Sequence, residues 1–195
     1  EPVVILVLAT LVLREHVSPR LAAGVAVAVL GVVFVVYQPG AAGAATGVTL
    51  TLVSVGFCAA YTVLTRRLLL DDASLTVALV QQVAALTFAV LLATGVALVG
   101  GTGWDLAGHS AGVWAGAAVS GVLYYGLGFA FFVTGLRHVP AAYAAAFLPL
   151  IPVFGLAAGY LIGERLEPRQ WIGAAAIVAT TALIARWQRG TPSTT

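Results

Sequence analysis

The sequence has few charged residues, a single cysteine, no lysine and no methionine. Charged residues fill only 8% of its 195 positions, whereas a soluble domain averages about 25%. Nine basic and seven acidic side chains cannot cover a water-soluble globule of this size, so that class is excluded. A net charge of +2 with scattered arginines argues against nucleic-acid binding. One cysteine excludes a disulfide framework and a multi-cysteine metal site.

The missing residue types also bear on origin. Without a methionine, the sequence is not expected to be a complete translation product that starts at residue 1. All nine basic residues are arginine, which, together with the alanine, valine and glycine excess, suggests a GC-rich bacterial source. The first residues are not expected to be a secretory signal peptide, because the apolar character continues along the whole chain.

Apolar residues dominate what is present. They make up 61% of the sequence, and the mean hydropathy is +1.05. An Arg or Asp at the centre of a bilayer costs about 2.5–3.5 kcal/mol, so a spanning helix needs a window without charges. Five such windows occur: 21–65, 73–104, 106–136, 138–163 and 170–185. They predict an all-α polytopic membrane protein that is embedded in the lipid bilayer.

Seven helical segments are expected. The first window is too long for one span and contains the turn-forming stretch 38–43. The predicted helices are 20–37, 47–65, 74–99, 112–136, 140–162 and 169–187, preceded by 1–13 as the end of a longer helix. Four tryptophans suit the membrane interface: Trp104, Trp114, Trp171 and Trp187.

Arginine counting predicts the orientation. With the C-terminal tail 188–195 in the cytoplasm, the alternation of helices places seven arginines on the cytoplasmic side and two on the other side. Residues 190–195 are expected to be disordered.

Two stretches of the sequence match at an offset of 149 residues. They share the frame Glu-x3-Pro-Arg-x3-Gly, with Glu15, Pro19, Arg20 and Gly24 in the first copy and Glu164, Pro168, Arg169 and Gly173 in the second. An odd number of predicted helices separates the copies, so they should lie on opposite membrane faces. This is an inverted-topology repeat, which many secondary transporters have. We expect 47–187 to be a complete five-helix repeat and 1–37 to be the last two helices of another, so that seven of ten helices are present.

The stretch from Pro152 to Gly173 resembles the end of an EamA domain, in which a proline-bearing helix runs into a Gly-Glu-Arg-Leu turn and a Gln-x-x-Gly helix follows. Residues 1–24 are similar to the same region of a first domain, except that Arg14 replaces the glycine and Leu21 the glutamine. The resemblance identifies the chain as a member of the drug/metabolite transporter superfamily, truncated at its N-terminus. It implies ten helices in two inverted repeats, and it makes the glutamates and the Pro and Gly of each frame family signature residues.

Candidate residues for a substrate cavity are polar or helix-breaking positions far from the helix ends. A polar group in hydrocarbon needs a partner, so it should face the bundle interior. The candidates are Tyr61, Gln81, Gln82, Tyr124, Tyr125, Tyr143, Pro149 and Pro152. Helical neighbours point about 100° apart, so one member of each Gln and Tyr pair should face the cavity. The two prolines could free carbonyls near the cavity or could simply kink the helix for packing.

Three glycines and one glutamate carry further expectations. Gly155, Gly159 and Gly163 form overlapping GxxxG patterns, which predict close packing on another helix or arise by chance among 22 glycines. Glu1 is a candidate for proton coupling, because its helix is expected to begin upstream; the alternative is an edge position near the outer interface.

Function is expected to be secondary transport by alternating access across the cytoplasmic membrane, as a permease or exporter. The resemblance implies small organic substrates such as amino acids, metabolites or drugs. The alternative is a membrane scaffold or partner subunit that does not transport; a homodimer is compatible with either. Enzyme motifs such as HExxH, GxSxG and the P-loop are absent, no histidine lies mid-membrane, and no cofactor or metal is predicted.

Overall fold

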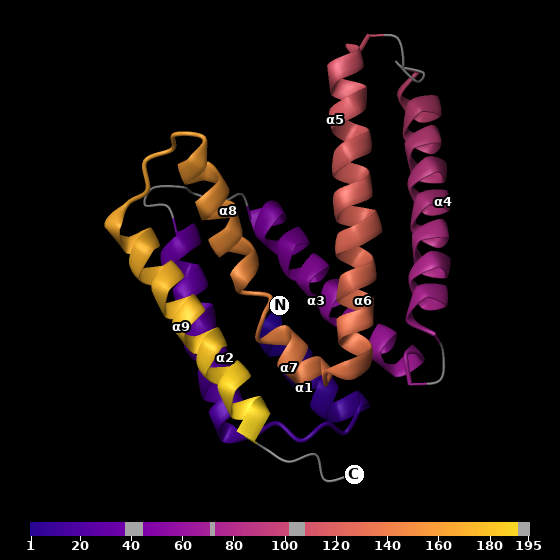
Figure 1. The fold of residues 1–195 in the computed structure, drawn as a ribbon. Coiled ribbons are helices and arrows are strands. Elements are labelled where there is room, and N and C mark those ends of the chain that lie inside the picture. The colour runs from indigo at the N-terminus through magenta and orange to yellow at the C-terminus, as the bar shows by residue number, and fades with distance from the viewer. Residues whose placement is uncertain (38–44, 71–72, 102–107, 191–195) are drawn as a thin grey trace. The chain divides into compact units, whose positions relative to one another are not determined.

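The computed structural model describes residues 1–37, 45–70, 73–101 and 108–190, and these residues form helices and no strand (Figure 1). The predicted turn at 38–43, Trp104 and the final residues of the predicted tail lie outside the described residues. The chain forms two compact units, one from residues 1–64 with 139–195 and one from residues 65–138.

All seven predicted segments are helical, and two of them are interrupted. The bounds are α1 Pro2–Val12, α2 Pro19–Val36, α3 Ala45–Leu68, α4 Ser74–Gly100, α5 Ala111–Gly121, η1 Val122–Gly128, α6 Phe129–His138, α7 Ala141–Ala145, α8 Leu150–Leu161 and α9 Pro168–Gly190. In the segment Ala111–His138, the π-helical turns of η1 interrupt the α-helical hydrogen-bond pattern, although the segment stays helical throughout. The other interruption separates α7 from α8 beside Pro149.

Within the described ranges, five helices are long and apolar enough to cross a membrane: Pro19–Val36, Ala45–Leu68, Ser74–Gly100, Ala111–His138 and Ala141–Leu161. This confirms the predicted all-α polytopic membrane class. Helix α1 has 11 residues, about 17 Å, which is short of a bilayer core of about 30 Å. Helix α9 is longer, but Arg169 and Arg186 limit its uncharged part. Its crossing of the membrane stays a prediction.

The two sequence copies have the same local structure at an offset of 149 residues. Helices α1 and α8 end at Val12 and Leu161, and the left-handed residue that follows is Arg14 (φ 55°) in one copy and Gly163 (φ 98°) in the other. Both following helices then begin with a proline, Pro19 or Pro168, at the first helical position. A proline suits that position, because its missing N–H would have no partner inside the helix.

A side chain close in sequence caps the N-terminus of each of these second helices, α2 and α9. Ser18 Oγ accepts the N–H of Leu21 at 3.2 Å before α2. At the start of α9, Gln170 Oε1 accepts the N–H of Glu167 at 2.8 Å. Both contacts satisfy backbone donors that the helix cannot use, so both copies fix where their second helix begins.

Helices α2 and α9 pack side by side and run antiparallel (Figure 1). A Cβ on Gly24 would lie 2.8 Å from Ile184 Cδ1, and a Cβ on Gly173 would lie 3.0 Å from Val35 Cγ2. The two contacts are equivalent under the 149-residue offset: Gly24 of α2 corresponds to Gly173 of α9, and Val35 of α2 corresponds to Ile184 of α9. The glycines let the two backbones approach, and the matched contacts give the pair an approximate two-fold relation.

The region from α7 to α8 is held in place by contacts within the first unit. Helix α7 packs on α1, with Ile5, Ala9, Ala141 and Ala145 buried between them. Pro149 interrupts the helix after α7 because it has no N–H to donate. The hydroxyl of Thr181 in α9 donates to the carbonyl of Ala146 at 3.5 Å, so this carbonyl finds a partner inside the protein.

The predicted packing of another helix on Gly155, Gly159 and Gly163 is not seen among the described residues. A Cβ on Gly155 or Gly163 would meet nothing within 4 Å, and one on Gly159 would meet the Glu164 carboxylate of the following turn at 2.5 Å. Gly163 is needed for its positive φ instead. The glycines in tight helix contact are Gly24, Gly31 and Gly173.

Candidate functional site

A cleft of about 730 Å³ lies in the second unit, between α4 and the helix formed by α5, η1 and α6. Its α4 wall consists of Leu75, Ala78, Leu79, Gln82, Ala85, Leu86 and Ala89, and its other wall of Gly121, Val122, Tyr125, Gly126, Phe129 and Ala130. The lining is mostly aliphatic and aromatic with few polar groups, which is typical of a small-molecule site.

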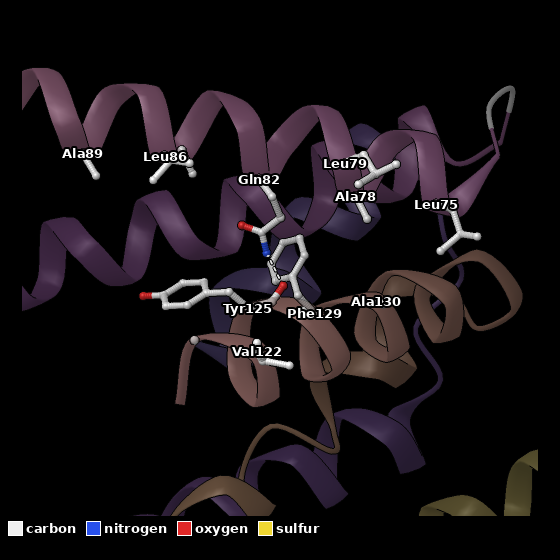
Figure 2. Close-up of a pocket in the computed structure, with 13 residues that line it drawn as sticks. Leu75, Ala78, Leu79, Gln82, Leu86, Ala89, Val122, Tyr125, Phe129 and Ala130 are labelled. Carbon is white, nitrogen blue, oxygen red and sulfur yellow. Dashed lines mark hydrogen bonds between the residues drawn. The ribbon is translucent and has the colours of Figure 1, made fainter. Parts of the chain in front are cut away.

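One hydrogen bond crosses this cleft. Gln82 Nε2 donates to the backbone carbonyl of Tyr125 at 2.7 Å, as the dashed line in Figure 2 shows. Tyr125 lies in the π-helical segment η1, which is wider than an α-helix because each bond spans one more residue. Short π-helical segments occur frequently at functional sites, and a side chain bonded to the backbone is one known cause of irregular helix geometry.

The two members of each polar pair on these helices differ in their surroundings. Gln82 and Tyr125 line the cleft. Gln81 Nε2 instead donates to the hydroxyl of the buried Thr65 at 2.8 Å. Tyr124 is outside the lining and meets the Tyr125 ring edge-on, with the centroids 4.9 Å apart. A single glutamine therefore supplies the side-chain amide of this cleft.

The apolar part of the lining was not among the residues expected from the sequence. Leu75, Leu79 and Leu86 recur at helical spacing around Gln82 and share its face of α4. This recurrence at three, four and seven residues is the signal that would have found them. The signal is weak in a membrane helix, because any apolar residue there can equally face lipid.

The remaining cavity candidates lie in the first unit. Tyr61 lies on α3 and is half-buried. Tyr143 lines a separate cleft at the start of α2. Pro149 and Pro152 flank the start of α8. Glu1 is exposed as the residue that precedes α1, and its side chain makes no capping hydrogen bond.

The two signature glutamates differ in their contacts. The carboxylate of Glu15 accepts the N–H of Ala141 at 2.8 Å and the N–H of Ala142 at 2.9 Å. These are the first residues of α7, so Glu15 caps that helix from a different part of the chain. Glu164 is exposed and lies over Gly159. No cluster of three potential metal ligands occurs among the residues that were placed.

Residues 45–186 match the sequence model of the EamA-like transporter family. The chain belongs to this family. The match covers well over half of the sequence. Members of the family are transporters of the drug/metabolite type rather than enzymes. No curated protein and no solved structure gave a significant match. Family membership and the five apolar helices together make this EamA protein a multi-pass membrane protein.

Proposed function

We propose that this EamA protein moves small neutral organic molecules, such as amino acids, metabolites or drugs, across the cytoplasmic membrane by alternating access. The observation that carries the proposal is the cleft between α4 and η1. Its volume and apolar walls suit a small organic molecule, and Gln82 and the Tyr125 ring provide one polar and one aromatic contact for orientation. Among the described residues, no charged side chain lines the cleft, which favours a substrate without a large net charge.

The antiparallel contact of α2 and α9 supports an inverted repeat. Two elements related by a half-turn perpendicular to their axes make the same contact twice, as Gly24 with Ile184 and Gly173 with Val35 do. In secondary transporters, such repeats supply the two related halves that move past each other. We therefore assign 1–37 and 47–187 to two repeats, although the compact units divide the chain differently.

The proposed orientation has the C-terminus in the cytoplasm, because the arginine asymmetry favours it. A reporter enzyme that is active only outside the cytoplasm, fused after residue 195, should be inactive. Activity of that fusion would reverse the orientation.

Any proton coupling is proposed to use Glu1 rather than a carboxylate of the second half, 47–187. Glu15 caps α7, so it is occupied by a structural role. Glu1→Gln should abolish the dependence of transport on a pH gradient. If that dependence instead survives in Glu1→Gln and disappears in Glu164→Gln, the coupling runs through the second half.

Transport itself is tested with the full-length protein in proteoliposomes, using a panel of labelled amino acids and neutral drugs. We expect uptake above that of empty liposomes for at least one compound, and competition among compounds of one class. Gln82→Leu should weaken this uptake, because it removes the amide that crosses the cleft. Thr94→Val is the matched control, since Thr94 lies on the same helix, is outside the cleft lining, and donates its hydroxyl to the carbonyl of Val90 in its own helix.

The proposal fails if no compound in the panel is taken up by protein that is folded and correctly inserted. It also fails in its assignment of the site if Gln82→Leu and Thr94→Val transport equally well. In that second case, transport continues through another path.

A further inference from the structure

A second cleft, of about 540 Å³, lies in the first unit where α2 begins and α9 nears its end. It differs from the α4–η1 cleft in having charged walls. Its lining consists of Ser18, Pro19, Arg20, Leu21, Tyr143, Ile184, Arg186 and Trp187. Two arginines therefore face one concave surface, and no described carboxylate lies within ion-pair distance of either.

The position of Arg20 is electrostatically unfavourable for the helix itself. It is the second residue of α2, and the N-terminal end of a helix carries a partial positive charge. A cation in the first turn is repelled by this charge, whereas an anion is attracted. Arg186 adds a second positive charge to the same cleft. Both repulsions are relieved if an anion lies between the two guanidinium groups.

The second sequence copy shows how the same position is balanced elsewhere in the chain. Arg169, 149 residues after Arg20, lies with its Nε 2.6 Å from Glu167 Oε2 as an ion pair. Its guanidinium carbon also lies 5.8 Å from the centre of the Tyr37 ring. The copy thus surrounds its arginine with an acid and an aromatic ring, and both contacts favour a cation.

In the first copy both of these partners are replaced. The residue equivalent to Glu167 is Ser18, which carries no charge, and the residue equivalent to Tyr37 is Arg186. The two-fold relation of α2 and α9 therefore brings Arg186 to Arg20 where it brings Tyr37 to Arg169. Beside Arg169 the chain has a carboxylate and an aromatic ring. Beside Arg20 the equivalent positions carry a hydroxyl and a second guanidinium group.

We propose that this cleft, defined by Ser18, Arg20, Tyr143, Arg186 and Trp187, binds the phosphate of an anionic lipid headgroup. Arginine binds phosphate oxygens through paired N–H donors, and the hydroxyls of Ser18 and Tyr143 add polar groups to the same lining. Trp187 suits the depth of the headgroups, and basic pockets between membrane helices are a known form of lipid headgroup site. Free phosphate shares this chemistry, so the test separates the two sources.

The experiment compares the purified protein in nanodiscs or micelles that contain phosphatidylcholine alone, phosphatidylglycerol or cardiolipin. Native mass spectrometry counts retained lipid, and thermal unfolding measures stabilisation. We expect retention of phosphatidylglycerol or cardiolipin and a higher unfolding temperature with either lipid. Arg20→Gln and Arg186→Gln should each weaken the retention about fivefold. Inorganic phosphate in phosphatidylcholine should give little stabilisation, because it lacks an anchor in the bilayer.

Arg165→Gln is the matched control, since it removes the same charge from an exposed residue of the α8–α9 turn that is outside the cleft lining. In phosphatidylcholine alone, the two cleft variants should unfold at the wild-type temperature or above, because each removes a repulsion. Equal lipid retention by wild type, both cleft variants and Arg165→Gln would overturn the proposal. Stabilisation by inorganic phosphate without a preference for anionic lipid would overturn the lipid as its source.

Discussion

Arg14 and Gly163 occupy the same left-handed backbone position in the two sequence copies, 149 residues apart. Glycine adopts a positive φ at no steric cost, whereas a residue with a Cβ loses about 1–2 kcal/mol there. Arg14 is the one described residue other than glycine that has a positive φ. The first copy therefore keeps the turn after its helix although it lacks the residue type that favours it.

Arg14→Gly should stabilise the protein. The gain in free energy of unfolding should be below about 1 kcal/mol, because glycine also increases the entropy of the unfolded chain. The reverse change at the matched position, Gly163→Ala, should destabilise by a similar amount or more. Thermal unfolding in detergent measures both. Unchanged unfolding temperatures for both variants would contradict a strained Arg14.

Gly173→Ala should destabilise the α2–α9 pair more than Gly24→Ala does. A Cβ on Gly173 would lie 2.6 Å from the carbonyl oxygen of Gly31, so the two backbones must separate. A Cβ on Gly24 would meet the end of the Ile184 side chain, which can change its rotamer. We expect a loss of about 1–3 kcal/mol for Gly173→Ala and less for Gly24→Ala.

Gly155→Ala is the control for these helix contacts, since a Cβ there would meet nothing within 4 Å. Its unfolding temperature should equal or exceed that of the wild type, because alanine favours the helix over glycine. A larger loss for Gly155→Ala than for Gly173→Ala would show that the tight interface lies on α8 instead.

Glu15→Ala should loosen α7, because it removes a carboxylate that accepts two backbone N–H groups at the start of that helix. The expected loss is about 1–2 kcal/mol, which is the usual value of an N-terminal cap. Amide hydrogen exchange of residues 141–145 should accelerate at the same time. Glu164→Ala serves as the comparison, and an equal effect of the two substitutions would remove the special role of Glu15.

The helices were predictable from the sequence because charge-free windows are long and obligatory in a bilayer. The turn of each sequence copy was also visible, since Pro19 and Pro168 mark where the next helix begins. Two features were not visible. The π-helical turns of η1 leave no pattern in an apolar stretch, and the cap that Glu15 provides joins residues 126 positions apart. Glycine spacing also does not reveal which helix comes near, and among the described residues a Cβ on Gly155 or Gly163 meets nothing within 4 Å.

Tyr125→Ala should affect transport more than Tyr124→Ala. Tyr125 lines the cleft, whereas Tyr124 is outside the lining and only meets the Tyr125 ring edge to face. Loss of an aromatic contact of about 1.4 kcal/mol would raise the KM about tenfold, provided that KM reflects substrate binding. We expect the KM of Tyr124→Ala to change less than about threefold. An edge-on ring pair contributes only about 0.5–1.5 kcal/mol, and part of the effect of losing it falls outside the cleft. Tyr125→Phe separates the ring from its hydroxyl: a KM close to wild type assigns the contact to the aromatic face. Equal KM values for Tyr125→Ala and Tyr124→Ala, at equal protein levels in the membrane, would show that the substrate does not contact this wall of the cleft.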